Sequence, residues 1–278
     1  MTFHTLISTN DLAAHLGDDR YVVVDCRFDL ADVGAGRRLY EAAHIPHAVF
    51  ADVNKDLAGT LTGSNGRHPL PEPATFIATL GRLGIANDTQ VVAYDQDTGM
   101  YASRLWWMLR WMGHTAVAVL DGGYAKWSAE GRAVRSGIER RPAREFRGVP
   151  HDAMIASIAD VSAGPPLLDA RAPERYRGDV EPIDRVAGHI PGARNHFYKT
   201  NLADDGVFKA PTALREMFSQ SLGDTSVERL VCYCGSGVTA CHNLLALEHA
   251  GLPGARLYPG SWSEWSSDAA RPVERSEK

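Results

Sequence analysis

The chain has 278 residues, 44% of them hydrophobic, and its 29 basic and 34 acidic side chains give a formal charge of −5. That length and composition favour one large domain or two ordinary ones over a disordered chain. Basic residues form no run that would bind nucleic acid or anionic lipid. No apolar run approaches the roughly 20 residues of a membrane span, and the first residues lack the pattern of a secretory signal. We therefore expect a cytoplasmic protein that binds neither membranes nor nucleic acid.

The two halves of the chain repeat the same motifs in the same order. An apolar run that ends in Asp-x-Arg occurs at 21–27 and again at 166–171, and AHIPHA at 43–48 is echoed by GHIPGA at 188–193. Two later pairs follow at similar offsets, VVAYD with VCYC and AVLDGGYAKW with RLYPGSWSEW. Such self-similarity indicates a duplicated structural unit.

Between these short apolar runs, hydrophobic residues recur with the 3.6-residue period of helices. The predicted helices span 74–84, 101–113, 212–223 and 238–251. Strands that alternate with helices predict an α/β fold of two tandem domains, each a mainly parallel sheet flanked by helices. We place the N-terminal domain at 1–130 and the C-terminal domain at 151–278. The charged segment 131–150, which contains Gly and Pro without periodicity, is predicted to link them.

The segment 229–251 joins a strand, a glycine-containing loop and a helix. The strand ends at Cys234, and the loop continues with Gly235, Ser236, Gly237, Val238 and Thr239. In an open parallel sheet, ligands bind just beyond the carboxyl ends of the strands. Two glycines in so short a turn let backbone N–H groups point inward and form an anion site with the helix N-terminus. Such a site favours the nucleophilic thiolate of Cys234 and can also hold a persulfide.

The first half has Asp95 at the position that matches Cys234, and its loop is one residue longer. We therefore predict that the N-terminal domain is an inactive copy and that the C-terminal domain is catalytic. Taken together, the duplicated halves, the HIPGA turn, the CGSGVTA loop and the closing GSWSEW resemble the rhodanese family over nearly the whole chain. Thiosulfate-type members usually carry basic residues directly after the cysteine, whereas CGSGVT is similar to the 3-mercaptopyruvate type.

The resemblance implies a sulfurtransferase that works by double displacement. Cys234 takes sulfur from a small anionic donor, 3-mercaptopyruvate or thiosulfate. The persulfide then passes it to a thiol such as thioredoxin or a low-molecular-weight thiol, or to cyanide. No metal and no organic cofactor is implied. Two alternatives stay open: a thiosulfate-specific rhodanese, and a persulfide carrier or regulatory module that loads once without turnover.

The resemblance also implies which residues bind the donor. Arg175 falls where family members place an arginine for the donor carboxylate, and a forked guanidinium suits a buried carboxylate. A second arginine is usual in the family, and Arg185 lies near that position but shifted from it. The loop residues expected to contact the donor are Gly235, Gly237, Val238 and Thr239.

A proton relay is the third feature that the resemblance implies. Ser236 and His68 match a serine and a histidine of the 3-mercaptopyruvate type. The aspartate that completes the relay aligns with Asn54, and Asp52 lies two residues earlier. Asparagine can orient an imidazole by hydrogen bonding but cannot stabilise imidazolium as a carboxylate does.

Two other uses of these residues fit the sequence less well. A phosphatase of this fold needs an arginine six positions after its cysteine, where this chain has Ala240. Zinc ligation by Cys232, Cys234, Cys241 and His242 does not match paired C-x-x-C spacing. Cys232 shares a buried strand with Cys234, so we expect it in the core.

Asp25 and Arg27 recur in the second half as Asp169 and Arg171. Because the pattern is also present in the copy expected to be inactive, it favours a structural role. We predict one buried ion pair in each domain.

Overall fold

A computed structural model describes residues 2–276 and separates the chain into two compact units. Unit 1 contains the chain up to Gly59, Pro71–His151 and Asp204–Val207, and unit 2 contains Thr60–Leu70, Asp152–Ala203 and the chain from Phe208 onward. The segment Thr60–Leu70, which lies within the first half of the sequence, thus groups with the second unit. Among the described residues, no helix is long and apolar enough to cross a lipid bilayer.

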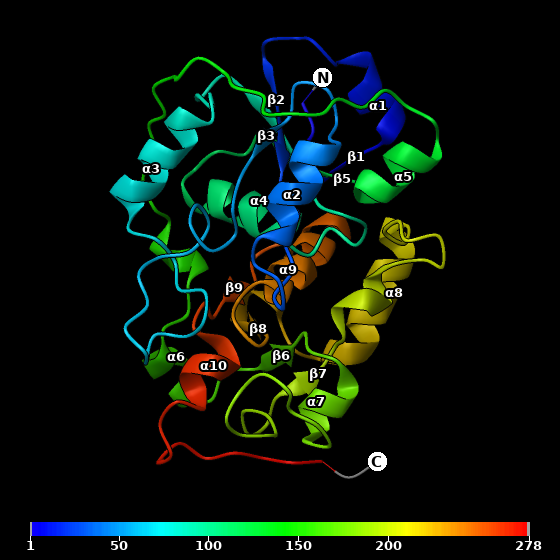
Figure 1. Cartoon of the computed structure of the whole chain (residues 1–278). Coiled ribbons are helices and arrows are strands. Elements are labelled where there is room, and N and C mark those ends of the chain that lie inside the picture. Colours follow the sequence, from blue (N-terminus) through cyan, green and yellow to red (C-terminus); the bar gives the residue numbers. More distant parts are fainter. Residues whose placement is uncertain (1, 277–278) are drawn as a thin grey trace. The chain divides into compact units, whose positions relative to one another are not determined.

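Unit 1 is built on a five-stranded sheet in the order β1-β5-β4-β2-β3, with every neighbouring pair parallel (Figure 1). Its strands are β1 (Leu6–Ile7), β2 (Tyr21–Asp25), β3 (Val49–Phe50), β4 (Gln90–Tyr94) and β5 (Val117–Leu120). Its helices are α1 (Thr9–Ala14), α2 (Ala35–Ala42), α3 (Pro73–Arg82), α4 (Ala102–Trp111) and α5 (Gly123–Ala129). All residues of β2 and β4 are buried, as expected for parallel strands covered on both faces.

Unit 2 is built on a four-stranded parallel sheet in the order β7-β6-β8-β9. Its strands are β6 (Leu167–Asp169), β7 (Arg194–Asn195), β8 (Val231–Tyr233) and β9 (Arg256–Leu257). Its α-helices are α6 (Ile158–Ser162), α7 (Pro173–Arg177), α8 (Pro211–Leu222), α9 (Thr239–His249) and α10 (Ser261–Trp265). Three 3-10 turns complete the unit: η1 (Asp152–Met154), η2 (Tyr198–Asn201) and η3 (Val227–Arg229).

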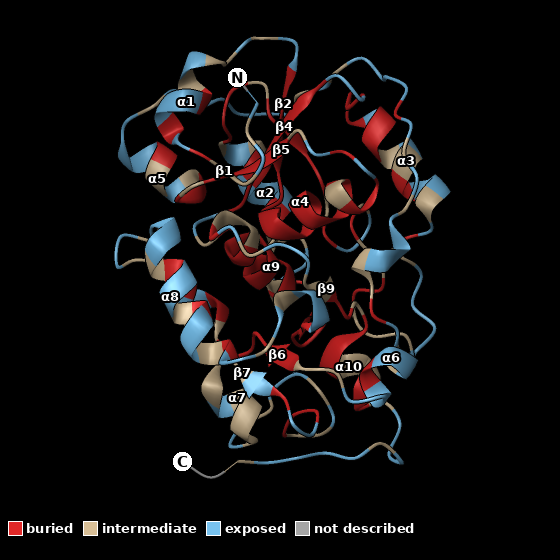
Figure 2. Cartoon of the chain, turned by 180° about the vertical axis from the view of Figure 1, so that it is seen from behind, coloured by how far each residue is buried: buried red, intermediate tan, exposed pale blue. Residues whose placement is uncertain are grey.

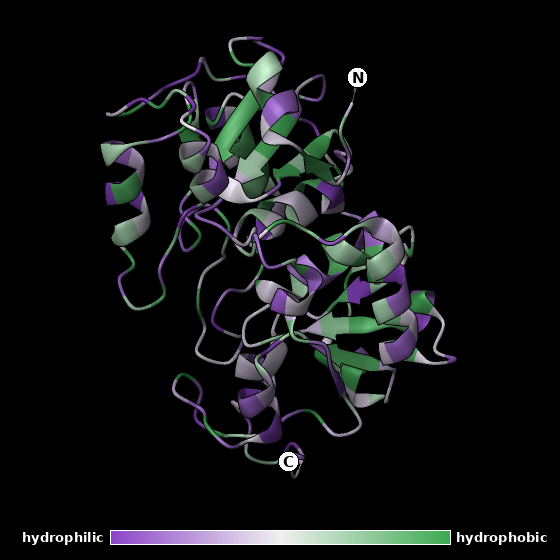
Figure 3. Ribbon diagram, turned by 90° about the vertical axis from the view of Figure 1, so that its right-hand side faces the viewer, coloured by the Kyte–Doolittle hydropathy of each residue, from purple (hydrophilic) through white to green (hydrophobic). Residues whose placement is uncertain are grey.

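The two sheets have the same strand order when matching strands are compared. The order β3-β2-β4-β5 of unit 1 corresponds to β7-β6-β8-β9 of unit 2. The place of β1 beside β5 is taken in unit 2 by a single parallel bridge between Ile155 and Leu257. In both units the hydropathy colouring shows green strands at the centre (Figure 3). The predicted α/β class with tandem, mainly parallel domains is confirmed.

The most buried helices are those that follow the central strands. Helix α9 follows β8 and is buried from Ala240 to Leu247, and α4 follows β4 and is buried almost throughout (Figure 2). Both helices bury polar side chains as well as apolar ones, among them His242 and Asn243 of α9. The helix after the Cys234 loop is therefore anchored along nearly its whole length.

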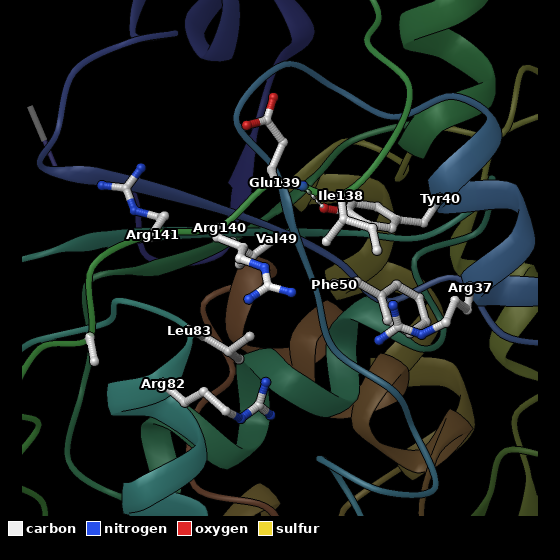
Figure 4. A pocket seen from close by; sticks show the side chains of 11 residues that line it. Arg37, Tyr40, Val49, Phe50, Arg82, Leu83, Ile138, Glu139, Arg140 and Arg141 are labelled. Carbon is white, nitrogen blue, oxygen red and sulfur yellow. Dashed lines mark hydrogen bonds between the residues drawn. The ribbon is translucent and has the colours of Figure 1, made fainter.

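The segment 131–150 packs on unit 1 as an extended strap. Its backbone exchanges hydrogen bonds between Arg135 and His44, with N–O distances of 2.8 and 2.9 Å, and Phe146 is buried. The strap also closes one side of a cavity of about 450 Å³, into which the guanidinium groups of Arg82 and Arg140 point (Figure 4). The other residues that line the cavity are Arg37, Tyr40, Val49, Phe50, Leu83, Ile138, Glu139, Arg141 and Ala143.

A buried Asp–Arg ion pair lies at the end of β2 in unit 1 and at the end of β6 in unit 2. Arg27 donates to Asp25 from its backbone N–H, Nε and Nη2, and Arg171 makes the same three types of bond to Asp169. All four side chains are at most 2% exposed. Burial raises the pKa of Asp25, and its bonds to Arg27 oppose that rise. The prediction of one structural pair in each unit is confirmed.

Removal of one charge from either pair should destabilise its unit, because a buried guanidinium loses its nearest counter-charge. We expect Asp25→Asn and Asp169→Asn each to lower the free energy of unfolding by about 3–5 kcal/mol. Chemical denaturation monitored by circular dichroism measures the change. The matched control is Asp18→Asn, whose partner Arg20 is largely exposed and which should move the unfolding midpoint little. Equal effects in the three variants would contradict this account.

Candidate active site

Cys234 is the first residue after β8, and the helix α9 begins five residues later at Thr239. The loop between them is buried, and Cys234 is only 2% exposed. This exposure is lower than we expect for a nucleophile that meets its substrate from solvent. The Cys234 side chain is therefore almost completely covered by its surroundings in the structure.

The first residues of α10 hold the Cys234 loop by its backbone. Trp262 donates its N–H to the carbonyl of Cys234 and Ser263 donates to the carbonyl of Gly235, both at 2.9 Å. The hydroxyl of Ser261 accepts the N–H of Cys234 at 3.1 Å. Two of these bonds occupy the carbonyl groups of Cys234 and Gly235, and the third occupies the N–H of Cys234. Together they fix the direction of the loop.

The amide groups that follow Cys234 are not used in the same way. Among the described residues, the N–H groups of Gly235, Ser236 and Val238 have no hydrogen-bond partner. Gly237 lies at φ +75°, and a Cβ atom there would lie 2.5 Å from the carbonyl oxygen of Pro259. Only glycine fits so tight a turn, which keeps the neighbouring N–H groups together at the start of α9.

The matching loop of unit 1 shows what such a turn binds. The carboxylate of Asp95 accepts N–H groups from Gly99 at 2.8 Å, Tyr101 at 2.7 Å and Ala102 at 3.2 Å. Burial raises the pKa of Asp95 to about 6, and the three N–H donors oppose the rise. A carboxylate thus fills the anion site in the copy without a cysteine. In unit 2, the position of Asp95 is taken by a sulfur atom.

His68 and Ser236 lie together, as the sequence predicts. The Nδ1 atom of His68 is 2.8 Å from the hydroxyl oxygen of Ser236, and both residues are buried. The segment of His68 is fixed to α10, because Arg67 donates its N–H to the hydroxyl of Ser263 at 3.0 Å. A Cβ atom on Gly66 would lie 2.7 Å from the carbonyl oxygen of Gly260. The close packing leaves little freedom for the imidazole.

The two residues considered for the third member of the relay both lie in unit 1. The carboxylate of Asp52 accepts the N–H groups of Asn54 at 2.9 Å and Lys55 at 3.2 Å, which closes a local turn. Asn54 itself is exposed. In the structure, Asp52 therefore serves its own loop. A role for either residue in proton transfer stays a prediction.

Two guanidinium groups lie beside Gly235, directly after Cys234. A Cβ atom on Gly235 would lie 3.6 and 3.7 Å from the Nη1 and Nη2 atoms of Arg175, and 3.0 Å from Nη2 of Arg67. Arg175 was expected here, and Arg67 was not. Arg185, the second arginine named from the sequence, is exposed. In the sequence, only the position of Arg67 directly before His68 could have pointed to it. Its contact with Gly235 depends on the folded position of Thr60–Leu70 within unit 2.

The rhodanese-like domain, as a family model, matches the chain twice, at residues 8–130 and 152–268. The chain belongs to the rhodanese family. A Pseudomonas aeruginosa relative named among the 3-mercaptopyruvate sulfurtransferases is 47% identical over 98% of this chain and 99% of its own. The thiosulfate sulfurtransferase of Rattus norvegicus is 35% identical over 95% of this chain and 92% of its own. The solved 3-mercaptopyruvate sulfurtransferase from Leishmania major is 33% identical, with a TM-score of 0.85 over 94% of this chain and 74% of that one.

These comparisons confirm the prediction of a sulfurtransferase of the rhodanese family.

The other thiols of this rhodanese lie in the core. Cys26, Cys232 and Cys241 are fully buried, and Cys241 donates to the carbonyl of Gly237 at 3.2 Å. His242, once considered as a zinc ligand with them, instead contacts the side-chain amide of Asn201 at 3.2 Å. The prediction that Cys232 belongs to the core is confirmed.

Alkylation of the native protein should distinguish Cys234 from the other three thiols. Burial raises the pKa of Cys26 and of Cys232, so both stay protonated and unreactive near neutral pH. We expect iodoacetamide to label Cys234 alone, and a change from about pH 7 to about pH 9 to recruit neither Cys26 nor Cys232. Peptide mass mapping measures the sites, and unfolded protein should show all four. Native labelling of Cys232 at the rate of Cys234 would contradict this assignment.

Proposed function

We propose that this rhodanese transfers sulfur from 3-mercaptopyruvate, through a persulfide on Cys234, to a thiol or cyanide acceptor. The observation that carries the proposal is the pair of matching loops. The loop of unit 1 holds the carboxylate of Asp95 on three N–H groups, and the loop of unit 2 presents unpaired N–H groups next to Cys234. An anionic sulfur, either thiolate or persulfide, fits the second loop as a carboxylate fits the first.

The first half-reaction loads the enzyme. The Cys234 thiolate attacks the sulfur of 3-mercaptopyruvate, an S–S bond forms and the donor C–S bond breaks with its electron pair going to carbon. The resulting enolate takes up a proton and leaves as pyruvate, while the proton of the donor thiol is removed. The N–H groups of Gly235, Gly237, Val238 and Thr239 are proposed to stabilise the charge on the outer sulfur.

The second half-reaction transfers the outer sulfur from the Cys234 persulfide to the acceptor. A thiolate, such as that of thioredoxin or a low-molecular-weight thiol, or cyanide attacks the outer sulfur, and the S–S bond breaks to return the Cys234 thiolate. Among the described residues, no cysteine forms a disulfide bond. Cysteines kept as thiols suit the reducing cytoplasm, where thiol acceptors are abundant, and we propose that the protein lies there.

His68 and Ser236 are proposed to move the proton. The contact of 2.8 Å between His68 Nδ1 and the Ser236 hydroxyl lets the pair take the proton of the donor thiol and return one to the enolate carbon. Arg175, beside Gly235, is proposed to bind the donor carboxylate. Arg185 is retained from the sequence as a second candidate for that role.

Replacement of the nucleophile tests the proposal directly. We expect Cys234→Ser to reduce sulfur transfer to background with both 3-mercaptopyruvate and thiosulfate. Wild-type protein treated with donor alone should gain about 32 Da, one sulfur atom, on the peptide that contains Cys234. Cys241→Ser is the matched control, because its thiol lies on the adjoining helix and is fully buried. Transfer that persists in Cys234→Ser would refute the proposal, and a single round of loading without turnover would indicate a carrier.

The proton relay predicts a difference between the two donors. Pyruvate leaves as a carbanion that needs a proton, whereas sulfite leaves thiosulfate with its electron pair and needs none. We therefore expect His68→Gln and Ser236→Ala to lower kcat with 3-mercaptopyruvate by about 100-fold and to affect thiosulfate far less, since a positioned acid–base group contributes 10²–10⁴-fold. Steady-state rates with both donors measure this. A parallel loss with both donors would assign the pair to loop structure.

A further inference from the structure

Arg67 places its guanidinium beside Gly235, the residue after Cys234. A Cβ atom on Gly235 would lie 3.0 Å from Nη2 of Arg67, closer than it would lie to either terminal nitrogen of Arg175. Both guanidinium groups therefore lie beside the loop that carries the proposed nucleophile. The absence of a side chain at Gly235 is what leaves room for them.

One carboxylate spans the two guanidinium groups. Arg67 donates from Nη1 to Oδ1 of Asp184 at 2.6 Å, and Arg175 donates from Nη2 to Oδ2 of the same residue at 3.1 Å. Arg175 is also held by Glu181, at 2.7 Å. The side chains of Asp184 and Glu181 are 6% and 4% exposed, so these ion pairs are shielded from solvent. Asp184 thus fixes the separation of the two guanidinium groups at a spacing that a carboxylate can span.

Arg67 keeps donors that these partners do not use. Its Nε atom is buried and has no hydrogen-bond partner among the described residues, and its Nη2 atom faces Gly235. A buried N–H group without an acceptor is unfavourable, and a bound anion would satisfy it. The backbone of Arg67 is fixed by its bond to Ser263 and by the neighbouring His68–Ser236 contact. The guanidinium is therefore positioned before any ligand arrives.

We propose that Arg67 is a donor-binding residue that acts with Arg175 on the anionic end of the sulfur donor, with Asp184 holding the two guanidinium groups in place. The inference deepens the proposed function and rests on it. It assigns the second donor-binding arginine to Thr60–Leu70, the segment that also carries His68, and not to the exposed Arg185. One segment then supplies both the proton relay and a cation for the donor.

The test uses the two half-reactions of the double displacement. In such a mechanism kcat/KM for the donor depends on the first half-reaction, and kcat/KM for the acceptor depends on the second. We expect Arg67→Gln to lower kcat/KM for 3-mercaptopyruvate by about 10–100-fold, the effect of losing charge-assisted hydrogen bonds to a carboxylate. The value for 2-mercaptoethanol, an acceptor without a carboxylate, should not change. The kcat/KM of Arg67→Lys for 3-mercaptopyruvate should lie between the values of the wild type and of Arg67→Gln. Lysine keeps the positive charge but lacks the forked pair of N–H donors of a guanidinium.

Arg177→Gln is the matched control. Arg177 lies on α7 two residues after Arg175, is paired with Asp179 at 2.8 Å, and has a side-chain exposure of 25%, against 24% for Arg67. It should keep both kcat/KM values. Arg185→Gln, measured in parallel, should have a smaller effect than Arg67→Gln. Unfolding midpoints of all variants show whether a change in kcat/KM reflects a loss of folding. If Arg67→Gln does not fold, the donor kcat/KM of Arg67→Lys is compared with that of Arg177→Gln instead.

The outcomes separate this inference from the proposed function. A wild-type protein that forms no persulfide with either donor would overturn the proposed function and this inference with it. A wild-type protein that turns over, together with an Arg67→Gln value for the donor equal to that of Arg177→Gln, would overturn the inference alone. A larger loss in Arg185→Gln than in Arg67→Gln would return the role to Arg185.

Discussion

Backbone N–H groups gathered in a buried turn require an acceptor, and the loop after the central strand of each unit presents several of them together. In unit 1 the requirement is met within the chain, because the carboxylate of Asp95 accepts three N–H groups. In unit 2 the residue at that position is Cys234, and the N–H groups of Gly235, Ser236 and Val238 have no hydrogen-bond partner among the described residues. The proposed chemistry depends on this difference, since an anionic sulfur could complete the second loop.

The frame around the two loops is the same, but the copy with Cys234 has one strained position. Tyr124 donates its N–H to the carbonyl of Asp95 at 2.9 Å, as Trp262 does to that of Cys234. The residue before Tyr124 is Gly123, at φ +59°, whereas the residue before Trp262 is Ser261, at φ +53°. A left-handed backbone is unfavourable for serine, and the hydroxyl it brings holds the N–H of Cys234. Backbone strain is thus retained where it positions Cys234.

How much of this the sequence could predict depends on the distance along the chain over which each feature is formed. Helical periodicity and buried strand runs are local, so α3, α4, α8 and α9 fall within one or two residues of the predicted ranges. The Cys234 loop is also local and could be interpreted as an anion site. The contact of His68 with Ser236 joins residues 168 positions apart, and it was expected only because the chain resembles a family. Arg67 pairs with Asp184 across 117 positions, and no pattern within the sequence marks that pairing.

The low exposure of Cys234 is consistent with the charges around its loop. A thiolate or persulfide loses hydration when it is buried, so the protein must replace water with fixed dipoles and cations. In the proposed mechanism the N–H groups of Gly235, Ser236 and Val238, which have no partner among the described residues, supply the dipoles, and the guanidinium groups beside Gly235 supply positive charge. Cys26 and Cys232 are also buried, and burial raises the pKa of each. The reactivity proposed for Cys234 therefore rests less on its exposure than on the hydrogen-bond donors of its loop.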